Sequence, residues 1–130
     1  MVTARVFLRP DGALEMRANG HADFDELGKD PVCAGASTLA LTVAQCVDTM
    51  NEEDALEDVR IHIGGGNTRV VAKPKPEAFH EALDYFRVAA VGFQLLSEAY
   101  PEHVRLILNE TAETDSEAEE ADSDKEDSSP

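Results

Sequence analysis

Residues 20–37 read GHADFDELGKDPVCAGAS, and this stretch marks the change from strand to helix on which the fold depends. Asp30 is a typical helix N-cap, and Pro31 suits the first helical position because its missing N–H is not needed there. The stretch places His21 at the end of a predicted strand and Cys33 in the first turn of a predicted helix. A short loop joins the two, so we expect their side chains to lie close together.

Outward from this stretch, hydrophobic periodicity predicts a ββα unit that occurs twice and is followed by a last strand. Pro10-Asp11-Gly12 and Gly64-Gly65-Gly66-Asn67 are typical hairpin turns between alternating segments. The order β-β-α-β-β-α-β predicts an α+β domain in which two helices pack on a mainly antiparallel sheet. The predicted strands cover residues 2–9, 13–22, 59–63, 68–73 and 104–108, and the predicted helices cover residues 31–50 and 79–100.

The charge divides the chain into two parts. Residues 1–108 carry 10 Lys or Arg against 17 Asp or Glu, whereas residues 109–130 carry one Lys against 10 acidic residues. The second part cannot bury enough apolar surface to offset the entropy of ordering it, so we predict a domain over residues 1–108 and an acidic disordered tail over residues 109–130. With a net charge of −16 and no basic cluster along the sequence, we expect no direct nucleic-acid binding. The acidity favours a basic partner or simply keeps the protein in solution.

The sequence also bears on compartment and cofactors. No signal peptide and no apolar run of membrane-spanning length are visible, so we expect a cytoplasmic protein that does not enter a membrane. Cys33 and Cys46 lie 13 residues apart on one predicted helix, about 20 Å along its axis, which is too far for a disulfide. His62, His80 and His103 have no metal-ligand spacing, and we expect neither a metal nor a cofactor.

Cys33 and His21 are the candidate catalytic pair. A neighbouring imidazole and a helix N-terminus both stabilise a thiolate, and the same backbone N–H groups would hold the oxyanion formed when the thiolate attacks a carbonyl. His21 would take the thiol proton and return it to a leaving amine. The alternative is a small buried cysteine and an unrelated surface histidine, and the residue pattern alone favours that alternative.

Four further residues are candidates for supporting the site. Gly20 allows close approach beside His21, and Gly28 gives the loop a flexible joint. Asp30 caps the helix, orients His21, or does both. Ser37 follows Cys33 by one helical turn, where its hydroxyl either donates a hydrogen bond near the thiolate or is simply a polar helix residue.

The loop between Gly20 and Asp30 is a candidate cover for a bound substrate. We expect Phe24 or Leu27 to pack on the substrate when the loop closes. The alternative is an ordinary connection between a strand and a helix.

At these residues the chain resembles the ribosomal-processing cysteine protease family, Prp. The resemblance extends from Met1 to about Leu108. Pro31 departs from the aliphatic residue expected there, and the acidic tail is not a family feature. The matching residues are Gly20-His21-Ala22, Gly28, Asp30, Val32-Cys33-Ala34 and Ser37.

The resemblance implies a cytoplasmic, homodimeric endopeptidase that removes a short N-terminal extension from a large-subunit ribosomal protein through a thioester intermediate. Cys33 would be the nucleophile and His21 the proton donor and acceptor, with Asp30 and Ser37 supporting the site. There are two alternatives. One is a thiol amidase or acyl transferase that uses the same two residues on a small molecule, and the other is a non-catalytic module that binds a ribosomal protein or an assembly factor.

Overall fold

A computed structural model describes residues 1–26 and 28–108 of the chain. It contains five strands and two long helices in the predicted order β-β-α-β-β-α-β, which confirms the α+β class. The predicted tail over residues 109–130 and the contact expected from Leu27 lie outside the described residues. The elements are β1 (Val2–Leu8), β2 (Leu14–Asn19), α1 (Pro31–Glu52), β3 (Leu56–Gly64), β4 (Asn67–Pro74), α2 (Phe79–Ala99) and β5 (Val104–Leu108), with a short 3-10 turn at Pro76–Ala78 before α2.

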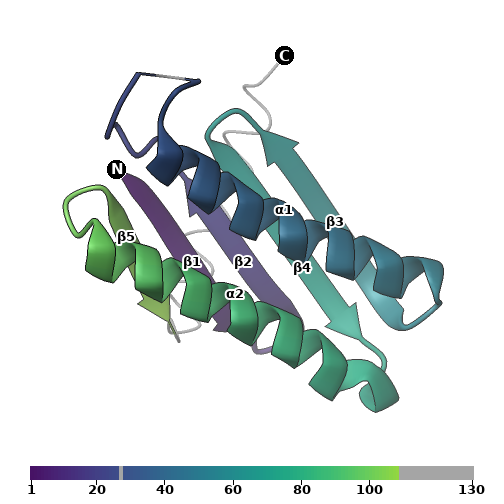
Figure 1. Cartoon of the computed structure of the whole chain (residues 1–130). Helices are drawn as coiled ribbons and strands as arrows, with labels where there is room; N and C mark the ends of the chain where they lie inside the picture. The colour runs from purple at the N-terminus through teal and green to yellow at the C-terminus, as the bar shows by residue number, and fades with distance from the viewer. Residues whose placement is uncertain (27, 109–130) are drawn as a thin grey trace.

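The five strands form one sheet in the order β3-β4-β2-β1-β5. β5 is parallel to β1, and the other neighbouring pairs are antiparallel, so the sheet is mainly antiparallel as predicted. Both helices lie side by side on one face of this sheet (Figure 1). The opposite face carries neither helix, so the architecture is two layers.

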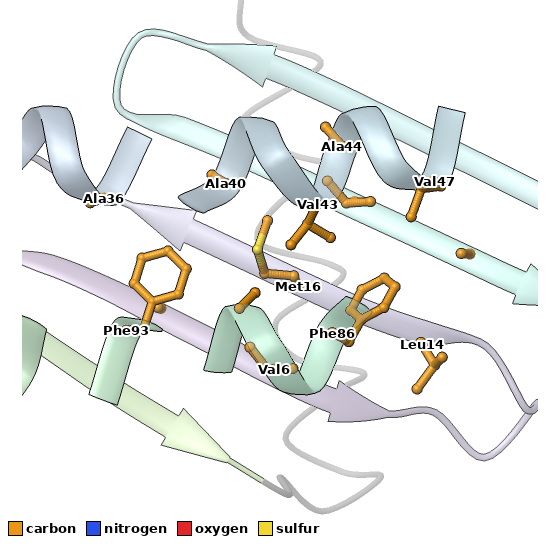
Figure 2. Close-up of a cluster of buried hydrophobic side chains, with 14 of the residues drawn as sticks. Val6, Leu14, Met16, Ala36, Ala40, Val43, Ala44, Val47, Phe86 and Phe93 are labelled. Atoms are coloured by element: carbon orange, nitrogen blue, oxygen red, sulfur yellow. The ribbon is translucent and has the colours of Figure 1, made fainter. Parts of the chain in front are cut away.

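The core lies between the two helices and the sheet (Figure 2). Strand alternation sends Val6 and Met16 towards the helices, where Phe86 and Phe93 of α2 are at most 1% exposed. The buried residues of α1 recur every three or four positions, as a one-sided apolar face requires. These residues are Val32, Ala36, Ala40, Val43, Ala44, Val47 and Met50.

The composition of α1 corrects one expectation from the sequence. The helix has 22 residues, and its most apolar stretch reaches a mean hydropathy of 1.2, so by length and composition alone it could cross a membrane. No apolar run of membrane-spanning length was expected from the sequence. The buried face of α1 packs on the sheet, which is the behaviour of a core helix.

β2 and β3 differ most from the predicted bounds. β2 ends at Asn19 instead of residue 22, because Gly20 has a φ of +97° that takes the backbone out of the strand conformation. β3 begins at Leu56 instead of residue 59, because a bulge after Leu56 lets this core residue pair with Pro74. The first difference matters for the site, since His21 follows the end of β2 and its position is not set by strand alternation.

A buried carboxylate organises the helix-free face of the sheet. Glu15 has no exposed surface, and it accepts hydrogen bonds from Arg17, from Arg69 at 3.0 Å and from Arg9 at 3.1 Å. Burial raises the pKa of Glu15, but the hydrogen bonds and charges of Arg69 and Arg17 outweigh it and hold the pKa below its usual value of 4.5. The charged form of Glu15 is therefore part of the native structure.

Replacing Glu15 by glutamine tests this carboxylate. We expect Glu15→Gln to lower the free energy of unfolding near neutral pH by about 3 kcal/mol, because it removes the buried negative charge to which Arg17 and Arg69 donate hydrogen bonds. Since the native pKa is below the usual one, the advantage of wild type is complete above the usual pKa and is lost as the pH falls through the native pKa. Urea denaturation near neutral pH and near pH 3 measures the difference, and a difference that does not shrink in acid contradicts this role.

Candidate active site

Asp30 joins the start of α1 to the loop that precedes it. Its Oδ1 accepts hydrogen bonds from the N–H groups of Val32 (2.9 Å) and Cys33 (3.0 Å), which confirms the predicted helix cap. Its Oδ2 accepts hydrogen bonds from the N–H groups of Phe24 (2.9 Å) and Asp25 (3.1 Å). Burial raises the pKa of Asp30, but these four hydrogen bonds outweigh it and hold the pKa below the usual 3.8.

The second role considered for Asp30, orienting His21, has no support in the geometry. Both carboxylate oxygens already accept two backbone hydrogen bonds each, and no hydrogen bond joins Asp30 to His21 among the described residues. Asp30 therefore shapes the site through the backbone, by fixing the helix start and the loop together.

The same cap corrects the expected source of oxyanion stabilisation. Pro31 has no N–H, Asp30 Oδ1 takes the N–H groups of Val32 and Cys33, and the carbonyl of Asp30 takes the N–H of Ala34 at 3.0 Å. The donors of the first helical turn are thus already paired. A free oxyanion donor must come from another segment of the site.

His21 is held by the turn between β3 and β4. Gly20 donates a hydrogen bond from its N–H to the carbonyl of Gly66 at 2.8 Å. The His21 ring lies against Gly66 so closely that a Cβ on Gly66 would be 2.7 Å from Nε2. Gly66 also has a φ of +73°, so both its backbone conformation and its neighbour require glycine.

A Cβ on Gly20 would meet backbone as well, at 2.2 Å from the carbonyl oxygen of Met1. The predicted close approach at Gly20 therefore exists, and the approaching group is the N-terminal strand. Gly28 also has a positive φ, but no atom lies within 4 Å of where its Cβ would be.

One cleft of about 260 Å³ brings the candidate pair together. Cys33 and His21 both line it, and Ser37 lines it from the next turn of α1. Among residues 1–26 and 28–108, no hydrogen bond joins His21 to Cys33, and Ser37 Oγ has no partner. Gly20 also lines the cleft, whereas Asp30 and Gly28 are not among its lining residues. The remaining lining residues are Val2, Ala18, Ala36, Ala40, Gly64, Gly65, Gly66, Asn67 and Thr68.

The glycine turn is the part of the site that the sequence analysis missed. It was interpreted as a hairpin turn, and the structure confirms this interpretation, but the turn also forms a wall of the cleft. In the described part of the chain, the backbone N–H groups of Gly65 and Gly66 have no hydrogen-bond partner. Three successive glycines in a turn that needs one positive φ were the available signal.

Phe24 does not cover the cleft. Its ring packs edge-on against Tyr100 and His103, at centroid distances of 5.2 and 5.4 Å. His103 Nδ1 lies 2.7 Å from the carbonyl oxygen of Ala22. The loop after His21 is therefore anchored on the turn between α2 and β5, and the packing of Phe24 on a bound substrate stays a prediction.

The substitution Asp30→Asn separates the two tasks of this side chain. An asparagine oxygen can still cap Val32 and Cys33, but its NH₂ group cannot accept from Phe24 and Asp25. We expect faster amide hydrogen exchange at Phe24 and Asp25 and unchanged protection within α1, as measured by NMR. Equal loss of protection in the loop and in the first turn of α1 would contradict the assignment of one Asp30 oxygen to the helix and the other to the loop.

The site can be compared with known proteins. Residues 1–105 match the family model described as cysteine protease Prp. The ribosomal processing cysteine protease Prp of Staphylococcus aureus (strain Mu50 / ATCC 700699) is 27% identical over 107 residues, which cover 82% of this chain and 97% of that protein.

Solved structures give the same result. The crystal structure of S. aureus Prp with a covalently linked product peptide superposes with a TM-score of 0.63 at 26% identity and covers 84% of this chain and 100% of that one. The S. aureus Prp complex with a substrate peptide gives a TM-score of 0.59 at 25% identity, with the same coverage of both chains. SMU.848 from Streptococcus mutans, at 23% identity over 84% of this chain and 94% of that one, shares the fold with a TM-score of 0.59. The chain belongs to the cysteine protease Prp family of hydrolases.

Proposed function

We propose that this chain is a cysteine endopeptidase that removes a short N-terminal extension from a large-subunit ribosomal protein, with Cys33 as nucleophile and His21 as proton donor and acceptor. One observation carries the assignment: Cys33 and His21 line the same cleft, whereas Cys46 lies elsewhere. Cys46 lines an apolar groove of about 100 Å³ between α1 and α2, whose described lining contains no histidine. Of the two thiols, Cys33 is the one that shares a cleft with a histidine among the described residues.

The proposed reaction proceeds in two steps. The Cys33 thiolate, whose proton has passed to His21, attacks the scissile carbonyl carbon; the C–N bond then breaks and His21 gives the proton to the departing amine. This step leaves a thioester on Cys33. Water, which passes a proton to His21, attacks the thioester carbonyl, and the C–S bond breaks. The acyl fragment leaves as a carboxylic acid, and the proton on His21 restores the thiol.

The negative oxygen formed in each step needs hydrogen-bond donors. The first turn of α1 cannot supply them, because Asp30 already accepts from its N–H groups. Gly65 and Gly66 line the cleft, and their N–H groups have no partner in the described part of the chain. We assign the oxyanion donors to this turn.

The reported activity of the relatives supports a ribosomal protein as the substrate. The S. aureus relatives are ribosomal processing proteases, and one of them was solved with a substrate peptide. Ribosomal proteins bind RNA phosphates and are basic, and this chain has a net charge of −16. Long-range attraction would bring the two together and would weaken with salt.

The proposal includes a homodimer in the cytoplasm. α2 carries an exposed apolar stripe at Val88, Val91 and Leu95, whose side chains are 57–69% exposed. A contiguous apolar stripe of this kind favours association with another protein surface, here a second copy of the chain. Both cysteines are free thiols, which suits a reducing compartment.

Cleavage of the ribosomal protein precursor encoded in the same genome tests the function. We expect Cys33→Ala to abolish cleavage and His21→Ala to slow it by about 10²- to 10⁴-fold, the usual contribution of a general acid–base. Cys46→Ala is the matched control and should cleave like wild type. Mass spectrometry of the products gives the rates, and full activity of either site variant would overturn the assignment.

Alkylation by iodoacetamide near neutral pH separates the catalytic proposal from a binding module. A thiol activated for catalysis should react much faster at Cys33 than at Cys46, and a binding module should show no such contrast. If the contrast is present but the precursor is not cleaved, the small-molecule amidase or acyl transferase becomes the better assignment.

The contact between Gly66 and His21 gives a further prediction. We expect Gly66→Ala to lower kcat by about 10- to 100-fold, because the new methyl group displaces the imidazole. Gly12→Ala is the matched control, since Gly12 also has a positive φ (+89°) but no atom within 4 Å of the added methyl group. Both variants place a side chain at a positive φ, so equal activities would show that the ring position does not depend on Gly66.

A further inference from the structure

The backbone is fixed on both sides of His21. Before it, Gly20 donates a hydrogen bond to the carbonyl of Gly66 at 2.8 Å. After it, Ala22 is 1% exposed, and its carbonyl oxygen lies 2.7 Å from Nδ1 of His103. A carbonyl oxygen only accepts hydrogen bonds, so Nδ1 of His103 is the donor and carries a proton. Two distant parts of the chain therefore hold the segment that carries His21.

The turn that carries His103 is itself held in place. The N–H group of His103 donates to the carbonyl of Tyr100 at 2.9 Å, and its carbonyl accepts from the N–H of Val2 at 2.9 Å. Val2 begins β1 and lines the cleft. The turn joins α2 to β5 at the end of the sheet where α1 begins (Figure 1). The His103 ring is therefore attached to a backbone that is hydrogen-bonded on both sides.

The residue after Ala22 has a backbone that needs such support. Asp23 has a φ of +55°, in the left-handed region that residues other than glycine rarely adopt. A residue keeps this conformation where the surrounding structure holds it. On one side, His103 holds the Ala22 carbonyl. On the other side, Phe24 donates to Asp30 Oδ2 at 2.9 Å and packs edge-on against His103, at 5.4 Å between ring centroids.

The imidazole of His21 depends on this backbone for its direction. In Ser-His-Asp sites a carboxylate orients the histidine ring through a hydrogen bond. Within residues 1–26 and 28–108, the His21 ring has no hydrogen-bond partner, and Asp30 does not take this role. His103 does not line the cleft, so it can affect the reaction only through the segment that it holds.

We propose that His103 is a positioning residue for His21. Its Nδ1–H group donates to the Ala22 carbonyl, fixes the backbone directly after His21, and so directs the imidazole towards Cys33. The inference rests on the proposed function, because it gives His103 a role in the reaction of Cys33 and His21. The contact is a hydrogen bond to the backbone, and it replaces the carboxylate that orients the ring in other sites.

The tautomer of His103 tests this hydrogen bond in the wild-type protein. We expect the neutral His103 ring to carry its proton on Nδ1, because the Ala22 carbonyl can only accept. Long-range proton–nitrogen correlation spectra of the histidine rings report which nitrogen is protonated. A neutral His103 ring with its proton on Nε2 would overturn the proposal, and the measurement needs no variant.

Two variants separate the hydrogen bond from the ring contact. His103→Phe keeps a ring beside Phe24 but has no donor, whereas His103→Asn loses the ring and keeps an N–H donor on Cγ. We expect His103→Phe to lower kcat for the precursor by about 10- to 100-fold with little change in KM, and His103→Asn to cleave nearly as fast as wild type. His80→Phe is the matched control and should behave like wild type, since His80 packs edge-on against Phe79 at 5.7 Å and does not line the cleft.

The NMR signals of the His21 ring give a readout that does not depend on cleavage. We expect these signals to shift in His103→Phe and to match wild type in His103→Asn and His80→Phe. Gly66→Ala, whose methyl group would meet the His21 ring, calibrates the shift of a displaced imidazole. If the shifts are present but the wild-type chain does not cleave the precursor, the proposed endopeptidase fails and the positioning role of His103 is supported.

Three results with the variants would overturn the proposal. The first is a folded His103→Phe protein whose His21 ring signals match those of wild type. The second is a His103→Phe protein that cleaves the precursor with the kcat of wild type. The third is an equal effect of His103→Asn and His103→Phe, which would assign the role to the ring contact with Phe24. If circular dichroism shows that His103→Phe does not fold, the wild-type tautomer and the His21 signals of His103→Asn decide, and shifted signals in His103→Asn overturn the proposal.

Discussion

The Asp30 carboxylate is the group on which the architecture of the site depends. Four backbone N–H groups converge on its two oxygens, two from the start of α1 and two from the loop that follows His21. One side chain therefore sets both where the helix begins and how the histidine segment leaves the sheet. As a consequence, the backbone N–H groups of the first turn of α1 already donate hydrogen bonds to Asp30. The N–H groups of Gly65 and Gly66 in the turn between β3 and β4 have no partner among the described residues, and they are the donors that we propose for a reacting carbonyl.

Much of this arrangement is visible in the sequence, and the remainder follows from contacts that no local pattern encodes. Alternation and helical spacing were sufficient for the order of elements, and the Asp30-Pro31 pair was sufficient for the start of α1. The end of β2 was missed because Gly20 adopts a positive φ that periodicity does not report. The position of His21 depends on Gly66, 45 residues further on, which only the β2–β4 pairing brings near.

The two faces of the sheet show how the same alternation can produce different environments. The helix side is an apolar core in which Met16 contributes a flexible side chain between packed aromatics. On the other side, the neighbouring residues Glu15 and Arg17 are buried too, as charges. The polar phase of β2 is visible in the sequence, but its burial is not, since Glu15 pairs with Arg69, which only the β2–β4 pairing brings near.

The Gly20–Gly66 hydrogen bond affects the order in which the site is assembled during synthesis and folding. His21 and Cys33 leave the ribosome almost together, but the turn that holds the histidine is made later, and β4 must pair with β2 before it can act. A half-made or unfolded copy thus carries Cys33, the proposed nucleophile, without a positioned His21. If these two residues act as proposed, the chain becomes competent for proteolysis only when the sheet is complete.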